Sequence, residues 1–405
     1  MEQDSSYGME QHGSSPNTLT KFLWSFPWLV RYPAWRVKEI ARRISKPESK
    51  THVIVMVANH YEPGLGEQAV RRVEGWWKEA RELGNAVRDH DGTPFRHTNF
   101  YPAEQYDHQL LELMAGMQRE GLGEVEVHMH HGVEQPDTPE NTRRMLAGFR
   151  DVLVDEHRCL SRDKKTGAAR YAFVHGNWAL ANSAGGRFCG VDNEMEILAE
   201  TGCYADFTLP SAPDESQVAR INSIYQCGRP MHERKPHNEG PDLKVGDNPK
   251  LPIIVEGPLV FDWRSRRKAG IPVPRVDDAA MAGNYPLSVD RFNRWRSANI
   301  TVRGRPDWVF VKLYCHGFFA WDRDMMIGGP VKVFWSEVME LAERTGQFKL
   351  HFASAREVFN MIMAAVQNQS GDPALYRDHC LVQVMDEAST SKVNGARPGS
   401  QLVLN

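Results

Sequence analysis

The segment Glu124-Val125-Glu126-Val127-His128-Met129-His130-His131-Gly132 decides the fold. Its short β-branched run predicts a strand, and three histidines stand at the end of that strand. His128 and His130 share one face of an extended strand, and His131 begins the turn that follows. The same arrangement, an apolar run that ends at a histidine or an acid, recurs along the chain.

Predicted strands alternate with predicted helices from Thr51 onward. The apolar runs are Val53–Ala58, Val125–Val127, Tyr171–Val174, Tyr204–Leu209, Ile253–Val255 with Leu259–Phe261, Trp308–Leu313 and Phe348–Phe352. The helical stretches between them are Glu67–Arg88, Pro139–Glu156, Glu194–Glu200, Phe334–Arg344 and Ala355–Val366. Thr138 is placed to cap the second helix, with Pro139 at its first position, and Gly202 is placed to end the third. The pattern predicts an α/β fold, a distorted or incomplete (β/α) barrel of about seven parallel strands.

Composition indicates a soluble globular protein. The chain has 405 residues, of which 41% are hydrophobic and 25% charged, with a net charge of −3. These values exclude a disordered, collagen-like or disulfide-scaffold chain, and the missing basic excess argues against a nucleic-acid partner. The six cysteines are dispersed, with no C-x-x-C pair, so we expect reduced thiols and a cytoplasmic location. The start of the chain is polar and lacks the pattern of a signal peptide.

The chain divides into four predicted parts. Residues 1–20 are expected to be disordered, 21–50 to form an aromatic and basic arm, 51–370 to form the barrel, and 371–405 to be a tail. Aromatic side chains of residues 22–35 lie next to basic residues, a pattern that suits peripheral contact with a membrane. The alternative is that the arm packs on the barrel through its tryptophans. We favour packing, because Pro27 and Pro33 would break a long amphipathic helix.

Histidine and acidic side chains, which can bind a metal or transfer a proton, follow several of the predicted strands. In a parallel barrel the active site lies at the carboxyl ends of the strands, so these side chains should converge. Histidines are good ligands for a divalent metal such as Zn²⁺, and the candidates here are His60, His128, His131 and His130. Glu62 is a candidate ligand or general base, and His316 a candidate general acid. The alternative for each is a structural polar residue at a strand end.

The remaining candidates would contact substrate or support a ligand. The run His175-Gly176-Asn177-Trp178 offers polar groups and an aromatic ring of the kind that stacks on sugars. Asp206 could orient a metal-bound histidine or cap the turn that follows it. His351 lies in the middle of a predicted strand and is interpreted as structural.

The order of these residues over about 51–365 resembles the polysaccharide deacetylase superfamily, whose members are metal-dependent carbohydrate esterases on a distorted (β/α) barrel. The resemblance implies that His60, His128 and His131 bind the metal and that His316 is the acid. Asn59 stands where the family has its catalytic base, and His175-Gly176-Asn177-Trp178 stands at the groove wall without the family's arginine. Asp206 stands at the family's fourth motif, without an adjacent tryptophan. The implied activity is hydrolysis of acetyl groups on a carbohydrate, with Asn59, His175, Asn177 and Trp178 near the substrate.

Two other functions remain open at this point. His128-Met129-His130 is the H-x-H pattern of amidohydrolase-like or phosphoesterase-like metal hydrolases, although these place it on their first strand. Asn59 in place of a base also fits a catalytically inactive carbohydrate-binding or assembly protein.

Overall fold

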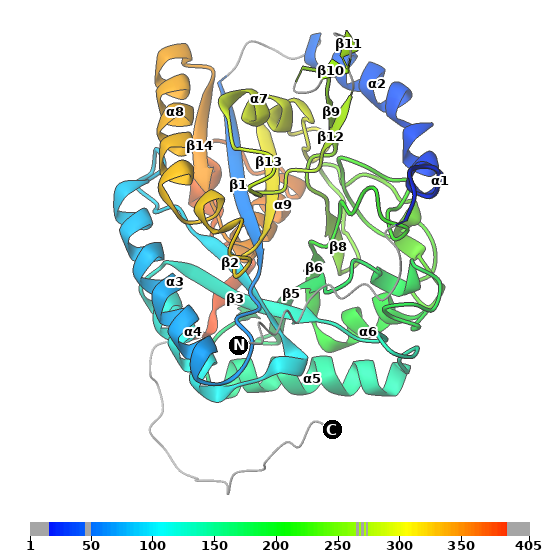
Figure 1. The fold of residues 1–405 in the computed structure, drawn as a ribbon, viewed down its shortest axis with the longest axis vertical. Helices are drawn as coiled ribbons and strands as arrows, with labels where there is room; N and C mark the ends of the chain where they lie inside the picture. The colour runs from blue at the N-terminus through cyan, green and yellow to red at the C-terminus, as the bar shows by residue number, and fades with distance from the viewer. Residues whose placement is uncertain (1–15, 45–49, 265–266, 269–270, 273, 387–405) are drawn as a thin grey trace, which may run out of the picture.

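The computed structural model describes residues 16–44, 50–264, 267–268, 271–272 and 274–386. It is a mixed α/β structure with a large, mostly parallel sheet of 11 strands (Figure 1). The order of the main path is β13-β1-β2-β3-β5-β6-β8-β7. In the described residues no ladder joins β13 to the far end of the sheet, so a closed barrel is not shown.

The parallel strands carry the residues of interest at their carboxyl ends. These strands are β1 (Thr51–His60), β2 (His97–Pro102), β3 (Gly123–Met129), β5 (Ala169–His175), β6 (Cys203–Asp206), β8 (Ile253–Val255), β13 (Trp308–His316) and β14 (Phe348–Phe352). Strand β14 pairs with the first half of β1, and β2 with its last residues. In the register His60 lies opposite His316, and Met129 opposite His175. The strand-end histidines are therefore neighbours.

Short strands extend the sheet and its surroundings. Strand β7 (Ile224–Tyr225) pairs antiparallel with β8, and β4 (Ser161–Asp163) joins β5 to β15 (Leu381–Gln383). Two separate hairpins pair β9 (Val260–Asp262) with β12 (Arg275–Asp277) and β10 (Arg267–Lys268) with β11 (Ile271–Pro272). Strand β15 lies inside the predicted tail, and Leu381 and Val384 are buried, so residues up to Asp386 belong to the domain.

Alternate residues of each strand face two different cores. On β1, Val53, Val55 and Val57 pack in a cluster with the outer helices. Those helices are α3 (Gly66–Ala86), α4 (His108–Arg119), α5 (Pro139–Asp155), α6 (Glu194–Thr201), α7 (Val289–Ser297) and α8 (Gly329–Thr345). Ile54, Met56 and Ala58 pack instead in a cluster with β6, β8, β13 and helix α9 (Ala355–Val366). Since side chains alternate along a strand, each strand end also has an inner and an outer face.

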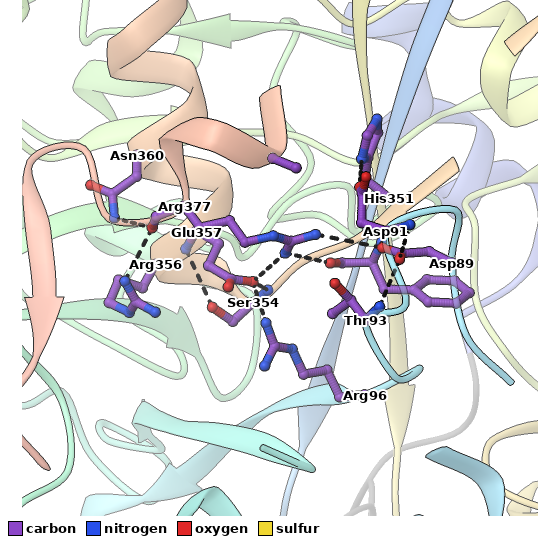
Figure 2. A network of polar contacts seen from close by, with 12 residues as sticks. Asp89, Asp91, Thr93, Arg96, His351, Ser354, Arg356, Glu357, Asn360 and Arg377 are labelled. Carbon is purple, nitrogen blue, oxygen red and sulfur yellow. Dashed lines mark hydrogen bonds and ion pairs between the residues drawn. The ribbon is translucent and has the colours of Figure 1, made fainter. Parts of the chain in front are cut away.

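A buried polar network anchors the start of α9 (Figure 2). Ser354 and Glu357 form a capping box, and Glu357 also pairs with Arg96 at 2.5 Å and with Arg377 at 3.0 Å. Arg356 makes a two-pronged ion pair with Glu124, at 3.0 and 2.9 Å. Burying these charges is tolerated because each has an opposite charge and hydrogen-bonding partners. The network joins α9 to the sheet and to the segment beyond residue 370.

Two helices precede the sheet at one edge of the molecule, beside β9–β12 (Figure 1). Helix α1 (Thr18–Leu29) runs through Pro27, and α2 (Tyr32–Ile44) begins with Pro33 in its first turn. The last residues of the segment expected to be disordered, from Thr18, are therefore helical. Trp28 is buried against Ala212, Ile221 and Leu259, so the arm packs on the domain through a tryptophan. No helix in the described part of the chain is long and apolar enough to cross a bilayer.

Most predicted elements match observed ones, but strand β2, helices α1, α2, α4 and α7, and several strands of two or three residues were not predicted. Val53–Ala58 lies within β1, Phe348–Phe352 is β14 and Ala355–Val366 is α9. Thr138 caps α5 and Gly202 ends α6 in the left-handed region, with φ 100°. Strand β2, His97–Pro102, was not predicted, because its sequence His-Thr-Asn-Phe-Tyr-Pro is largely polar and ends in proline.

Candidate metal centre

Four side chains meet at the carboxyl ends of β1 and β3, on the inner face of the sheet. We call His60, Glu62, His128 and His130 the inner cluster. Glu62 Oε1 lies 3.1 Å from His128 Nε2, 3.8 Å from His60 Nδ1 and 3.8 Å from His130 Nε2. His60 and His128 are buried, whereas Glu62 and His130 remain 14% and 22% exposed. One side of the cluster is thus open to solvent.

Hydrogen bonds fix which ring nitrogen of two histidines faces the centre. His128 Nδ1 donates to the carbonyl of Val174 at 2.7 Å, so its Nε2 points to Glu62. His130 Nδ1 is bound by Glu104 at 2.6 Å, which likewise leaves Nε2 toward Glu62. Backbone carbonyls and carboxylates are the usual partners of metal-binding histidines, because they fix the tautomer and raise ring basicity.

The charges in the inner cluster suit cation binding. Burial alone would raise the pKa of Glu62, but the hydrogen bond with His128 and the nearby His130 lower that pKa to about 2. Burial lowers the pKa of His60 well below its ordinary value, and the neighbouring His316 and His128 lower it further. At neutral pH the cluster therefore holds an ionised Glu62 and a neutral His60. The pKa of His130, which burial alone would lower, is raised by Glu104, so a metal at this centre would have to displace a proton from His130.

The spacing of the donor atoms fits a small divalent ion. A tetrahedral zinc site with bonds of about 2.1 Å places neighbouring ligand atoms about 3.4 Å apart. The separations from Glu62 Oε1 bracket that value. His60 Nδ1 is buried and has no hydrogen-bond partner in the described residues, an arrangement that a metal would relieve. His60, Glu62 and His128 could together hold a metal ion.

His316 and Trp178 border the inner cluster. The His316 ring lies 4.5 Å from the ring of His60 and stacks on Phe319 at 4.9 Å. Trp178 meets His316 edge-on at 6.5 Å, and both side chains are partly exposed. Burial lowers the pKa of His316, while the charge of Glu62 opposes that shift. The predicted acid and the predicted aromatic surface thus stand next to the candidate metal centre.

His131 and His175 belong to a different group of residues, which corrects their predicted placement beside His128. His131 Nε2 lies 3.1 Å from His175 Nε2 and 2.9 Å from Glu194 Oε1. The reason is the two-residue period of a strand: His128 and His130 face inward, so Met129 and the following His131 face the outer helices. His175 follows Tyr171 and Phe173 on that outer face and is fully buried, so it does not line a substrate site.

Three further predicted residues lie outside the inner cluster. Asn59 is fully buried on the outer face, away from the inner cluster, and its amide donates to Asn99 at 3.1 Å. Asp206 accepts from the backbone and hydroxyl of Thr208, which is the turn-capping alternative rather than the support of a histidine. Asn177 is partly exposed beside Trp178, and its amide oxygen has no partner in the described residues.

Sequence reasoning missed several residues that the fold brings to these sites. Glu104 follows β2. Because that strand was not predicted, Glu104 was not recognised as an acidic residue beyond a strand end. Cys189 and Glu194 lie in the loop before α6 and at its first position, away from any strand end. Only their chemistry as metal ligands could have drawn attention to them.

No protein-family model matches the sequence, and no curated protein matches it either. The resemblance to polysaccharide deacetylases therefore rests on the residues of this chain alone.

Proposed function

We propose that the protein is a metal-dependent hydrolase that removes acetyl groups from a carbohydrate. The observation that supports this most is the convergence of His60, His128 and His130 on the Glu62 carboxylate, with His316 and Trp178 beside it. All six residues lie at or just beyond the carboxyl ends of parallel strands, where α/β barrels carry their active sites.

The proposed ligands are His60, His128 and Glu62, with His130 as a further imidazole at the same centre. A bound Zn²⁺ would polarise the acetyl carbonyl and make a bound water acidic. The low pKa of Glu62 suits a ligand better than a general base, because a base works best with a pKa near the operating pH. His130 is oriented by Glu104 and stays partly exposed, so it can contact an incoming polar group.

His316 is the proposed proton carrier. Its ring stands next to His60 and is partly exposed, so it can reach both a water at the centre and the leaving group. The stacked Phe319 holds the ring in place. Trp178 presents an aromatic face at the open side of the cluster, where a sugar ring could stack.

A catalytically inactive carbohydrate-binding protein is the weaker alternative. That alternative depended on Asn59 standing in place of a base, but Asn59 faces the outer helices and Glu62 supplies the carboxylate on the inner face. The amidohydrolase-like alternative gains one observation, because His128 and His130 both direct Nε2 toward Glu62. The two hydrolases differ in substrate: acetylated sugars for the first, and cyclic amides, lactones or phosphoesters for the second.

The test combines metal analysis with a substrate panel. The experiment compares the wild type with Glu62→Gln, His128→Ala and His316→Asn, and uses His232→Ala, at an exposed histidine, as the control. The substrates are acetylated chito-oligosaccharides, acetylated xylan and the alternative substrates. His128→Ala should lose one metal equivalent relative to the wild type, and Glu62→Gln should lose turnover. His316→Asn should keep its metal but lose about 10²–10⁴-fold in kcat, as expected of an acid–base group. His232→Ala should change nothing.

Two results would overturn the proposal. One is a wild-type protein whose metal content His128→Ala does not lower. The other is turnover of amides or phosphoesters without any release of acetate, which would favour the amidohydrolase-like function.

A further inference from the structure

A second set of metal-binding side chains lies on the outer face of the sheet, under α5 and α6. We call His131, His175, Cys189 and Glu194 the outer cluster. Its four ligand atoms all lie within 4.8 Å of one another, and all four residues are buried. The residues come from the ends of β3 and β5, from the loop after β5 and from the first position of α6.

The separations in the outer cluster, 2.9–3.7 Å, lie on either side of those in a four-coordinate zinc site. His131 Nε2 lies 3.1 Å from His175 Nε2 and 2.9 Å from Glu194 Oε1. His175 Nε2 lies 3.7 Å from Glu194 Oε1, and Cys189 Sγ lies 3.6 Å from Glu194 Oε2. With zinc bonds of about 2.1 Å to nitrogen or oxygen and about 2.3 Å to sulfur, neighbouring ligands stand about 3.4–3.6 Å apart.

Surrounding hydrogen bonds orient the ligands as in known metal sites. Asp137 binds His131 Nδ1 at 2.9 Å, which leaves Nε2 to face the cluster. Asp137 is itself held by the Asn141 amide and the Thr142 hydroxyl, at 2.8 and 2.9 Å. The backbone amide of Ala181 donates to Glu194 Oε2 at 2.6 Å. A carboxylate behind a metal-binding histidine is the common supporting arrangement.

We propose that His131, His175, Cys189 and Glu194 hold a structural zinc ion, distinct from the ion of the inner cluster. Two imidazoles, a thiolate and a carboxylate are ligands that zinc accepts, and four protein ligands with no solvent-facing position define a structural rather than a catalytic site. This inference does not depend on the proposed hydrolase function.

The ion would fix the loop that carries Trp178. Residues 176–193 connect β5 to α6, and within them Trp178, Ala181, Asn182 and Phe188 all have φ between 48° and 62°. Such left-handed residues cost free energy and persist only where the surrounding structure holds them. Cys189 and Glu194 would tie the far end of this loop to His131 and His175, and so keep Trp178 beside His316.

Cobalt substitution tests the site through a signal that only the outer cluster can give. A cobalt(II)–thiolate bond produces an intense charge-transfer band in the near ultraviolet, and the inner cluster has no cysteine. We expect about two zinc equivalents in the wild type. The band should appear in the cobalt-loaded wild type and in His128→Ala, and be absent from Cys189→Ala. Cys203→Ala, an equally buried cysteine on β6, is the matched control and should keep the band.

The outcomes separate this site from the inner cluster. A cobalt-loaded wild type without the thiolate band overturns the proposal, whether or not Cys189→Ala folds. In that case His131 is a structural histidine between Asp137 and Glu194. A band that persists in His128→Ala while one metal equivalent and all turnover are lost supports both proposals. A band in a protein without hydrolase activity supports the outer site and contradicts only the proposed function.

An independent observation concerns the exposed face of α1. Leu19, Phe22, Leu23, Phe26 and Val30 are each 52–66% exposed and recur at helical spacing, so they form one apolar stripe. The buried Trp28 holds the opposite face on the domain. Glu39 is the only acidic residue in Thr18–Ile44, and it is buried, whereas Lys21, Arg31, Arg36, Lys38, Arg42 and Arg43 are basic.

We infer that α1 and α2 bind the surface of an anionic membrane. An exposed apolar stripe next to a basic segment is the pattern of helices that lie in the interface of a bilayer. Here the basic residues lie mostly on α2, where Arg36 and Lys38 are available while Arg31 and Arg42 pair with Glu239 and Glu39. Val37 and Ile40 continue the exposed apolar surface on α2, at 67% and 44% exposure. The excess of basic residues selects for anionic headgroups.

Vesicle sedimentation tests this inference. The wild type should sediment with phosphatidylserine-containing vesicles and not with pure phosphatidylcholine, and binding should weaken with salt. Leu23→Glu with Phe26→Glu should abolish sedimentation, whereas Leu375→Glu, at a 79% exposed leucine elsewhere, should not. Equal sedimentation of both variants, or no wild-type binding, overturns the inference. So does a wild-type dimer that the double variant converts to a monomer.

Discussion

Arg356 provides the sharpest test of how the inner core is held together. Its guanidinium pairs with Glu124 at 3.0 and 2.9 Å, and the side chains of Arg356 and Glu124 are only 3% and 5% exposed. It also donates to Asp378 and to the carbonyls of Arg377 and Leu381. Arg356→Met removes all of these bonds while keeping much of the side-chain volume.

The expected cost follows from what the substitution leaves behind. In the described residues Glu124 would keep the Gln383 amide, at 2.9 Å, as its hydrogen-bond donor and Arg96 as a neighbouring positive charge, but it would lose its direct ion pair. Breaking a buried ion pair by removing one partner typically costs about 3–5 kcal/mol of unfolding free energy. Arg81 and Glu120 form the same two-pronged pair at 2.9 and 2.8 Å but are 50% and 39% exposed. Arg81→Met should therefore cost much less unfolding free energy than Arg356→Met, because solvent screens an exposed ion pair.

Urea unfolding followed by tryptophan fluorescence measures both variants, with the free energies compared through midpoint and slope. The double variant Arg356→Met with Glu124→Leu should be less destabilised than the sum of its single variants, because no charge is left buried without a partner. The reasoning fails if Arg356→Met costs no more than Arg81→Met, or if the double variant shows no coupling.

Three further predictions follow from other parts of the structure. Burial raises the pKa of Glu126 from 4.5 to about 8, although hydrogen bonds from Tyr204 and Ala172 oppose the shift. Because the folded state favours the protonated acid, the unfolding free energy should fall as the pH rises from about 4.5 through 8. The urea midpoints of Glu126→Gln should not show that fall. Gly176→Ala places a Cβ 2.3 Å from the His130 ring and should lower metal content and turnover, whereas Gly148→Ala, with nothing within 4 Å, should leave metal analysis and kinetics unchanged. Ser354→Ala removes the cap of α9 and should lower the unfolding free energy by about 1 kcal/mol in the same urea assay; no change would show that the capping box adds nothing to the network in Figure 2.

Much of the fold could be predicted from the sequence, because the local preferences of these segments favour the same elements that tertiary packing requires. Val53–Ala58 is continuously apolar, and Phe348–Phe352 has an apolar residue at every second position; both are strands. Thr138 with Pro139 and Gly202 mark helix ends through backbone requirements that do not depend on distant contacts. Strand β2 was not predicted because its sequence is largely polar, and only its pairing with β1 and β3 places it inside the sheet.

Part of the candidate metal centre could be predicted from the sequence in the same way. The ends of the strands identified His60, Glu62, His128, His130 and His316, and the fold brings these together. The positions of the strand ends did not show which face of the sheet each histidine occupies where β3 ends and the loop begins. They also did not identify Glu104, Cys189 or Glu194, because the positions of these residues depend on an unpredicted strand and on a loop.

The sequence by itself determined where strands end and which polar groups stand there, because hydrophobic runs, caps and turn residues act over a few positions. Only the tertiary structure decided that His128 and His131, three residues apart, serve two different clusters. The reason is physical: a strand sends alternate side chains to opposite faces, and what covers each face is set by elements far away in the chain. Here α9 lies on the inner side of the sheet, and α5 and α6 lie on the outer side.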